Sequence, residues 1–411
     1  MLKKVSVGEL RVGMHIHEFC GSWMDHPFWR ESFKIKTAEE LREVQTCGVR
    51  EVWIDTAKGL DVERPAPTHE EVEAKVEDEL HRIETPAPAA PRPPRRAPIA
   101  EEMERAAKIC AQGKEQVISM FHEARMGKAI DHEAAGALVE EISASVMRNP
   151  GALVSLARLR TADDYTYMHS VAVCALMVAL SRVLELDEAT TREAGMAGLL
   201  HDLGKAVMPH EVLNKPGKLT DEEFAIMKRH PVEGHRMLVE GGAAGPIPLD
   251  VCLHHHEKIA GGGYPEGLAG EAISLYARMG AVCDVYDAIT SNRPYKAGWD
   301  PAESIRKMAE WQGHFDPRIF QAFVKSIGIY PTGSLVRLST DYLGVVIDQS
   351  PASLLTPLVN VFFSAKSGNY VEPYLVDLSR KGAQEKIVSR EDPARWGIKD
   401  INRFWTSHVS V

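Results

Sequence analysis

The pattern of apolar and polar positions divides the chain into a mixed beginning, a long helical middle and a strand-rich end. Apolar residues recur every three or four positions over 101–125 and 131–148, which predicts two amphipathic helices. Asn149-Pro150-Gly151 then ends the second helix. The same reading predicts further helices near 152–160, 164–185, 187–201, 221–240, 246–258, 274–292 and 301–326. Short connections between them predict an all-α central region.

Both ends of the chain have strand character. Thr37 and Glu40 form a capping box that opens a short helix, and residues 49–55 then alternate between apolar and polar like a strand. After Pro331, short β-branched or alternating runs separated by Gly, Pro and Ser predict strands over 334–338, 344–348, 358–364 and 370–378. The fold class is therefore mainly α, with a small mixed α/β N-terminal module and a β-rich C-terminal tail.

A compositional break separates the N-terminal module from the helices. An acidic stretch is followed by ETPAPAAPRPPRRAPI, and this proline-rich segment predicts an extended, semi-rigid linker. The expected division is a module over 1–62, a linker over 63–98, connecting helices over 99–150, a catalytic domain over 151–330 and a β-rich region over 331–411. The apolar faces of the connecting helices pack either within the chain or against a second copy in a homodimer.

Charge and cysteine content narrow the classes of function. The net charge of −10 argues against binding to nucleic-acid polymers, although it allows a small anionic nucleotide. Six scattered cysteines without a C-x-x-C pair predict free thiols in a reduced cytoplasm. The start of the chain has no apolar signal segment, and the longest strongly apolar run, 171–180, is too short to span a bilayer.

The central helices carry an ordered series of metal-binding residue types. Any one of them alone is more often a hydrogen-bonded core histidine or a helix-capping aspartate, but two adjacent pairs within one series favour a shared site. Imidazoles and carboxylates bind divalent first-row metals, a carboxylate can bridge two ions, and paired metals catalyse displacement at phosphorus. The candidate ligands are His169, His201, Asp202, His230, His255, His256 and Asp284. The neighbouring His254, and also His210, His235 and His314, are expected not to be ligands.

Several strings around these residues resemble a known family. HDLGK (201–205), KPGKLTDEE (215–223), GGGYPEGL (261–268) and SNRPYK (291–296) are very similar to the HD-GYP domain of the HD phosphohydrolase superfamily, over about residues 150–330. The N-terminal module and the tail resemble the uncharacterised domain that accompanies one branch of this family. The resemblance implies a phosphodiesterase that hydrolyses cyclic di-GMP to linear pGpG and ultimately GMP. It also implies that the seven candidates hold iron or manganese.

The resemblance also bears on the number of metals and on partners. Members with three metals have a glutamate one turn before the first histidine, where this chain has Tyr165, and Asp163 and Asp164 lie at the wrong helical phase. Two metals are therefore expected. The aspartate that usually precedes the GYP string is replaced by Ala260, which bears on loop stiffness or on contact with GGDEF-domain cyclases.

The expected mechanism uses a water or hydroxide between two metals as the nucleophile, with Asp202 fixing the metal spacing. Lys205 would neutralise the phosphate or protonate the leaving 3′ oxygen, and Asp287 would orient that lysine or a metal-bound water. The resemblance implies that Arg293 and Lys296 hold substrate phosphate. Gly263 and Tyr264 of the GYP string are expected to contact substrate and to support the site. The alternatives are a cyclic di-GMP sensor, which need not retain the complete ligand set, and a hydrolase of another cyclic dinucleotide.

Overall fold

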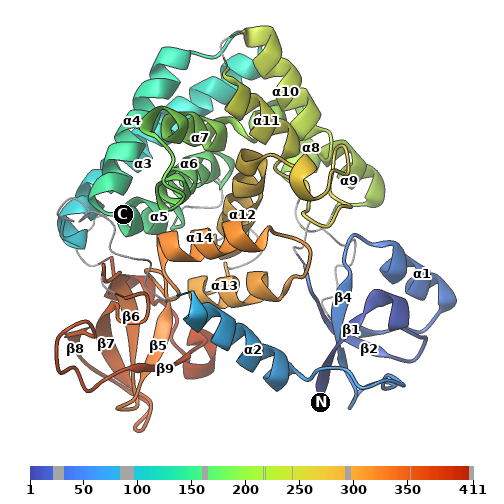
Figure 1. The fold of residues 1–411 in the computed structure, drawn as a ribbon, viewed down its shortest axis with the longest axis vertical. Helices are drawn as coiled ribbons and strands as arrows, with labels where there is room; N and C mark the ends of the chain where they lie inside the picture. The colour runs from blue at the N-terminus through green and yellow to red at the C-terminus, as the bar shows by residue number, and fades with distance from the viewer. Residues whose placement is uncertain are drawn as a thin grey trace.

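The computed structural model describes residues 1–21, 32–83, 97–159, 165–215, 217, 219–242, 244–291, 298–351 and 353–406, with backbone only at 165–166. The N-terminal module is an antiparallel sheet of order β1-β4-β2-β3 with one helix packed against it. Its elements are β1 (Leu2–Ser6), β2 (His15–Phe19), β3 (Phe33–Lys34), α1 (Ala38–Thr46) and β4 (Glu51–Asp55). The predicted capping box is present at Thr37, whose side chain accepts from the Glu40 amide. In Figure 1 the module lies across α13 from the C-terminal sheet.

The segment that was expected to be a linker is helical in its first half. Helix α2 (His69–Arg82) begins with a capping box of Thr68 and Glu71. Its Val76 and Leu80 lie one turn apart and are buried against the main core, so the acidic composition hides a short apolar stripe. The proline-rich part, 84–96, lies outside the described residues.

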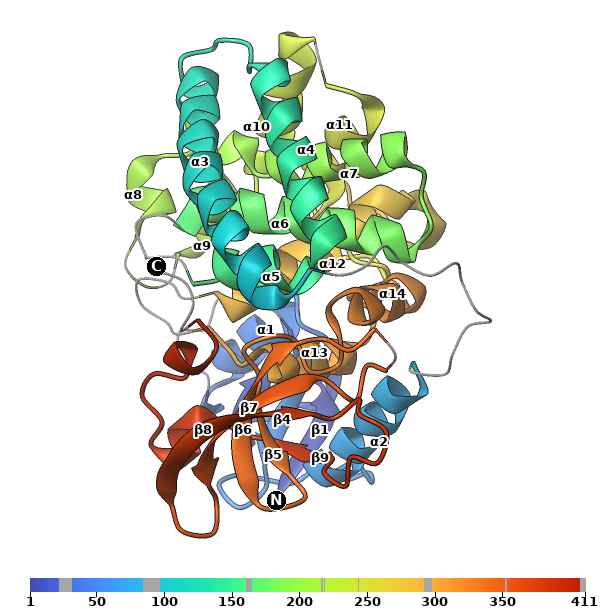
Figure 2. The ribbon, with the colours of Figure 1, turned by 90° about the vertical axis from the view of Figure 1, so that its left-hand side faces the viewer.

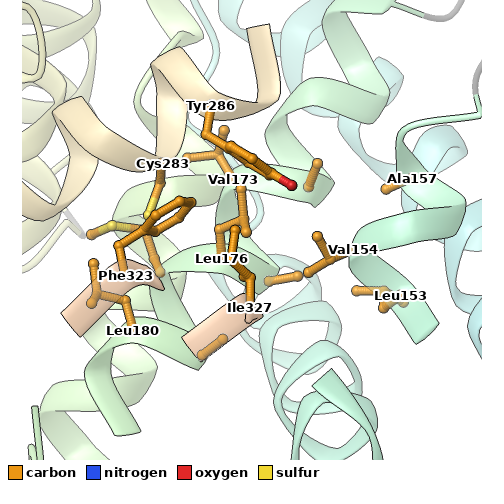
Figure 3. Close-up of a cluster of buried hydrophobic side chains, with 14 of the residues drawn as sticks. Leu153, Val154, Ala157, Val173, Leu176, Leu180, Cys283, Tyr286, Phe323 and Ile327 are labelled. Atoms are coloured by element: carbon orange, nitrogen blue, oxygen red, sulfur yellow. The ribbon is translucent and has the colours of Figure 1, made fainter. Parts of the chain in front are cut away.

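The central region is a helical domain built around α6 (Tyr165–Val183), whose side chains are buried almost without interruption from Met168 to Ser181. Because α6 is apolar all round, it forms the centre of the core. Helices that precede α6 in the chain and helices that follow it pack against α6. They are α3 (Ile99–Arg125), α4 (His132–Arg148), α5 (Pro150–Ala157), α7 (Glu188–Leu200), α12 (Leu275–Thr290) and α14 (Pro317–Ile327). Figure 3 shows this core between α5, α6, α12 and α14.

The connecting helices α3 and α4 lay their apolar faces on α5, α6 and α7 of the same chain. The remaining elements of the domain all follow α7 in the chain. They are the 3-10 helix η4 (Leu203–Val207), α8 (His210–Leu213), α9 (Asp221–Met227), α10 (His230–Gly241), α11 (Pro246–His254), the 3-10 helix η5 (Gly270–Ala272) and α13 (Pro301–Glu310).

Two of the expected helices are each broken into two. The expected helix over 221–240 is α9 followed by α10, and the one over 301–326 is α13 followed by α14. Pro231 and Pro317 sit in the first turns of α10 and α14, where a missing amide proton does no harm. Pro231 also prevents α9 from continuing, whereas α13 ends at Glu310, and Gly313, with a φ of +72°, lies in the turn that follows it.

The C-terminal tail is a five-stranded antiparallel sheet of order β8-β7-β6-β5-β9. Its strands are β5 (Leu335–Leu338), β6 (Tyr342–Asp348), β7 (Leu358–Ser364), β8 (Asn369–Asp377) and β9 (Ile387–Arg390). Four strands were predicted, and β9 was missed because its four residues show no buried face. Side chains such as Phe362 belong to the same core as the helices, so the sheet packs below them as one body (Figure 2).

The predicted class, mainly α with small sheets at both ends, is confirmed. Among the described residues, none of the helices combines the length and the hydropathy that a membrane-spanning segment needs.

Candidate metal centre

All seven predicted ligands come together at one buried point, although 115 positions separate the first from the last. Helix ends supply most of them, since a helix terminus can aim a side chain into a site without interrupting the packed helix. His201 is the C-cap of α7, Asp202 precedes η4, His230 opens α10, and His255 is the C-cap of α11 with His256 next to it. His169 and Asp284 lie within the buried helices α6 and α12.

Backbone carbonyls orient three of the imidazoles. The Nδ1 atom of His201 lies 2.8 Å from the Gly198 carbonyl oxygen, that of His230 lies 2.8 Å from the Met227 oxygen, and that of His255 lies 3.0 Å from the Val251 oxygen. A carbonyl can only accept, so each Nδ1 carries a proton and Nε2 is the atom left to bind a metal. This is the tautomer that a metal requires.

The free nitrogens face one another and the two carboxylates. The Nε2 atoms of His169 and His201 are 3.3 Å apart, and those of His230 and His255 are also 3.3 Å apart. Asp202 lies between the two pairs, with Oδ2 3.5 Å from His169 Nε2 and Oδ1 3.2 Å from His230 Nε2. One carboxylate therefore serves both sides, as a bridging ligand does.

The donors form two groups that could each hold an ion. One consists of His169, His201 and Asp202, and the other of His230, His255 and His256, with the ligand atoms of each group within 4.8 Å of one another. Asp284 Oδ1 lies 2.9 Å from His169 Nε2, which adds it to the first group. Among the described residues, Asp202 Oδ1, Asp284 Oδ2 and His256 Nε2 are buried without a hydrogen-bond partner. Such atoms are costly unless something binds them, and divalent cations fit this donor set.

The electrostatics of the cluster also suit a cation. Burial opposes the charged forms throughout, yet Asp202 and Asp284 raise the pKa of His201 to about 10. Burial, reinforced by the charges of His201 and His230, lowers the pKa of His255 to about 3. The pKa values of both carboxyls lie well below their usual range despite burial, for Asp202 because of Lys205 and His201 and for Asp284 because of its hydrogen bond to His169. Two buried anions thus attract positive charge, and bound metal would replace the proton on His201.

Two further predicted residues contact this cluster. Lys205 forms an ion pair with Asp202 Oδ2. Asp287, one turn after Asp284, places Oδ2 2.6 Å from Nδ1 of His169 and thus fixes the orientation of that ring. The contact of Asp287 with His169 was not predicted, because Asp287 was expected to orient Lys205 or a metal-bound water.

The GYP string packs directly on His256, the second of the two adjacent candidate ligands His255 and His256. The Tyr264 ring stacks on His256, with centroids 4.6 Å apart, and its amide lies 3.3 Å from the His256 carbonyl oxygen. A Cβ on Gly263 would lie 2.5–2.6 Å from the backbone of 256–258, so only glycine allows this approach. The buried Glu257 was missed, and its Oε1 accepts from the Glu266 and Gly267 amides, which ties the loop to the residue after His256.

Gly204 was also missed as a site residue. A Cβ there would lie 1.9 Å from the His230 carbonyl oxygen, so Gly204 lets η4 and α10 approach until Asp202 and His230 meet. Its place between Leu203 and Lys205 in the HDLGK string was the available signal.

His254 points away and places Nδ1 2.8 Å from Asp250 Oδ1, and it belongs to neither donor group.

Some predicted positions lie outside the described residues. They are Arg293 and Lys296, the two acidic residues Asp163 and Asp164, and the side chain of Tyr165.

A helical domain that gathers an adjacent His-Asp pair with further histidines at one buried point defines the HD class of proteins. Comparison with family models agrees: one described as an HD domain matches residues 146–319, and one described as a domain of unknown function (DUF3391) matches residues 2–135. The second match covers the N-terminal module, α2 and α3.

The chain is also similar to characterised proteins. It is 54% identical over 407 residues to the cyclic di-GMP phosphodiesterase PA4108 of Pseudomonas aeruginosa, covering 99% of this chain and 96% of that protein. It is 41% identical over 180 residues to the cyclic di-GMP phosphodiesterase response regulator RpfG of Xanthomonas campestris, covering 42% and 47% of the two chains. It is 32% identical over 182 residues to the 3'3'-cGAMP-specific phosphodiesterase 1 of Vibrio cholerae, covering 44% and 42%. The chain belongs to the HD-GYP family of HD-domain phosphodiesterases.

Proposed function

We propose that this protein hydrolyses cyclic di-GMP to linear pGpG and ultimately to GMP. The observation that carries the proposal is the paired donor set around Asp202, because two adjacent cation sites that share a carboxylate suit attack on a phosphodiester. Similarity to PA4108 over nearly the whole of both chains supports cyclic di-GMP as the substrate.

The seven ligands would hold two divalent ions, iron or manganese. When bound, these ions supply Lewis acidity and a water of lowered pKa as the nucleophile. Asp202 sets the distance between the two donor groups, and Asp287 keeps His169 in its ligating orientation.

Lys205 supplies a positive charge beside the proposed metal ions. It is held against Asp202, where it would neutralise the scissile phosphate or deliver a proton to the leaving 3′ oxygen. Arg293 and Lys296 would bind substrate phosphate, the first through two parallel hydrogen bonds and the second as a point charge. Gly263 and Tyr264 would line the substrate side of His256.

The loop around the GYP string could also bind a protein partner. Ala260, Gly262 and Glu266 are exposed on this loop, where GGDEF-domain cyclases could bind.

Two alternatives make different predictions. The similarity to the 3'3'-cGAMP-specific enzyme favours testing a hybrid cyclic dinucleotide as well. A sensor without catalysis would bind cyclic di-GMP and leave it intact.

The test is to purify the protein without oxygen, load it with Fe(II) or Mn(II), and separate the products of cyclic di-GMP and 3'3'-cGAMP by chromatography. We expect pGpG and then GMP from cyclic di-GMP, at a higher kcat/KM than for the hybrid. An Asp202→Ala variant should lose metal and activity together. Intact cyclic di-GMP after incubation with a fully loaded protein would refute the proposal.

A further inference from the structure

The N-terminal module contacts the loop that packs on the metal ligands. Arg50, just before β4, donates from Nη2 to the carbonyl oxygens of Ala260 at 2.7 Å and Gly261 at 3.2 Å. In the opposite direction, Lys258 of the loop donates from Nζ to the Gly48 carbonyl oxygen of the module at 3.3 Å. A charged module side chain is thus hydrogen-bonded three positions before Tyr264.

The module is also held by contacts beyond the loop. Lys4 Nζ lies 2.7 Å from the Glu310 carbonyl oxygen and 2.7 Å from Glu51 Oε2, and Lys307 forms an ion pair with Glu18. These contacts place α13 against the sheet of the module independently of Arg50. Removing the Arg50 side chain should therefore leave the module docked.

The conformation of the loop depends on hydrogen bonds to residues outside it. Gly261 and Gly262 have φ values of +80° and +81°, a conformation that favours glycine, so this stretch before Tyr264 has no side chains of its own to hold it in place. The amides of Ile259 and Ala260 donate to the carbonyl oxygens of His314 and Gly313, which fixes one side of the loop. Arg50 holds the loop from its other side by binding the Ala260 carbonyl oxygen, and the Tyr264 ring further along the loop stacks on His256.

We propose that Arg50 is a positioning residue for the metal centre, and that the N-terminal module thereby controls how Tyr264 is held against His256. The proposal rests on the role of His256 as a ligand in the proposed function. A signal that shifts the module would release the Ala260 and Gly261 carbonyls, loosen the loop and weaken the site that contains His256. Arg50 remains exposed, so this contact can break without disturbing a core.

The test compares Arg50→Ala and Arg50→Lys with Arg42→Ala in the full chain. Arg42 is a matched control because it is an arginine of the same module, on α1, away from the Ala260 and Gly261 carbonyls that Arg50 binds. Hydrogen–deuterium exchange of peptides covering 258–268 and titration with Mn(II) are the measurements, and neither needs cyclic di-GMP. Thermal midpoints establish that each variant is folded.

We expect faster exchange over 258–268 and about 3- to 10-fold weaker binding of Mn(II) in Arg50→Ala. This is less than the roughly 10- to 100-fold loss usual for a residue hydrogen-bonded to a ligand, because Arg50 acts on His256 only through the loop. Arg50→Lys should recover part of both effects, because an ammonium can still reach one carbonyl. Arg42→Ala should match the wild type. Unchanged loop exchange in Arg50→Ala, or Mn(II) affinity equal to that of Arg42→Ala, would overturn the proposal. A wild type that binds Mn(II) but leaves cyclic di-GMP intact would refute the proposed function alone.

Discussion

At the scale of the residue, the hydrogen bond between Asp287 and His169 provides a direct test of the metal centre. Asp287→Asn keeps the shape of the side chain but removes the charge that favours a proton on His169 Nδ1. We expect about 10- to 100-fold weaker binding of Mn(II), measured by titration, because groups that orient a ligand usually have effects of this size.

Asp250→Asn is the matched control for this substitution. Asp250 lies 2.8 Å from Nδ1 of His254, an aspartate–histidine pair of the same kind outside both donor groups. Equal losses of Mn(II) affinity in the two variants would mean that Asp287 has no specific role in orienting His169.

The seven candidate ligands could be picked out from the sequence because their residue types and order mark them, and the structure brings them together. The partner of Asp287 could not be predicted, because 118 positions separate it from His169 and the contact depends on how α6 packs against α12. Gly204 and Glu257 were missed for a related reason: one acts through the absence of a side chain and the other through backbone amides.

At the scale of the element, the close approach of η4 to α10 depends on Gly204. In Gly204→Ala the new methyl group would lie 1.9 Å from the His230 carbonyl oxygen, so one of the two elements must move. We expect a loss of about 1–3 kcal/mol in the free energy of unfolding, together with weaker metal binding because His230 shifts. Urea unfolding and Mn(II) titration measure the two effects.

Gly241→Ala serves as the control for Gly204→Ala. Gly241 is the last residue of α10, and a methyl group added there would meet nothing within 4 Å. The substitution should be neutral or slightly stabilising, since alanine favours helix over glycine. Full metal affinity in Gly204→Ala would show that the approach of η4 and α10 tolerates a methyl group.

The contact between α13 and β5 predicts a dependence on pH. Asp300 caps α13 by accepting from the Ala302 and Glu303 amides, and its other oxygen accepts from the Leu335 amide of β5 at 3.1 Å. Burial outweighs these hydrogen bonds and raises the pKa of Asp300 to about 6. Because the folded pKa is raised, stability is greatest where the group is protonated and falls as the pH rises from the unfolded pKa toward about 6.

The comparison that isolates this effect is with Asp300→Asn, which does not titrate. Between pH 4 and pH 7 the wild type should lose about 2 kcal/mol of unfolding free energy relative to the variant. Urea unfolding at the two pH values measures the difference. A difference that does not change with pH would mean that Asp300 titrates alike in the folded and unfolded chains.

Secondary structure was predictable where apolar periodicity was long, as in α3, α4 and α6. It was not predictable where a few residues decide the outcome. Helix α2 depends on Val76 and Leu80 within an acidic run, the break before α10 on Pro231, and the break before α14 on a short turn that contains Gly313. Strand β9 forms by pairing with β5, which no local pattern reveals.

At the scale of the whole molecule, the metal centre joins elements from most of the helical domain. The seven candidate ligands come from α6, α7, α10, α11 and α12 and from the residues beside them, and the core around α6 continues into the C-terminal sheet. The predicted boundary near residue 330 therefore marks a change of secondary structure within a continuous core. Among the described residues, the sheet of the N-terminal module has a separate hydrophobic cluster.

This arrangement predicts that metal stabilises the whole domain and not only the site. An ion that binds the folded chain alone, at a free concentration of about 100 times its Kd, adds about 2.7 kcal/mol, so two ions add roughly twice that amount. We expect removal of metal by EDTA to lower the thermal midpoint by several degrees and to speed amide exchange in α6, α10 and α12. Asp202→Ala, which lacks the shared carboxylate, should show little further change on addition of EDTA. If EDTA shifts the midpoints of wild type and Asp202→Ala equally, the metal that stabilises the fold is bound somewhere other than the seven-ligand centre.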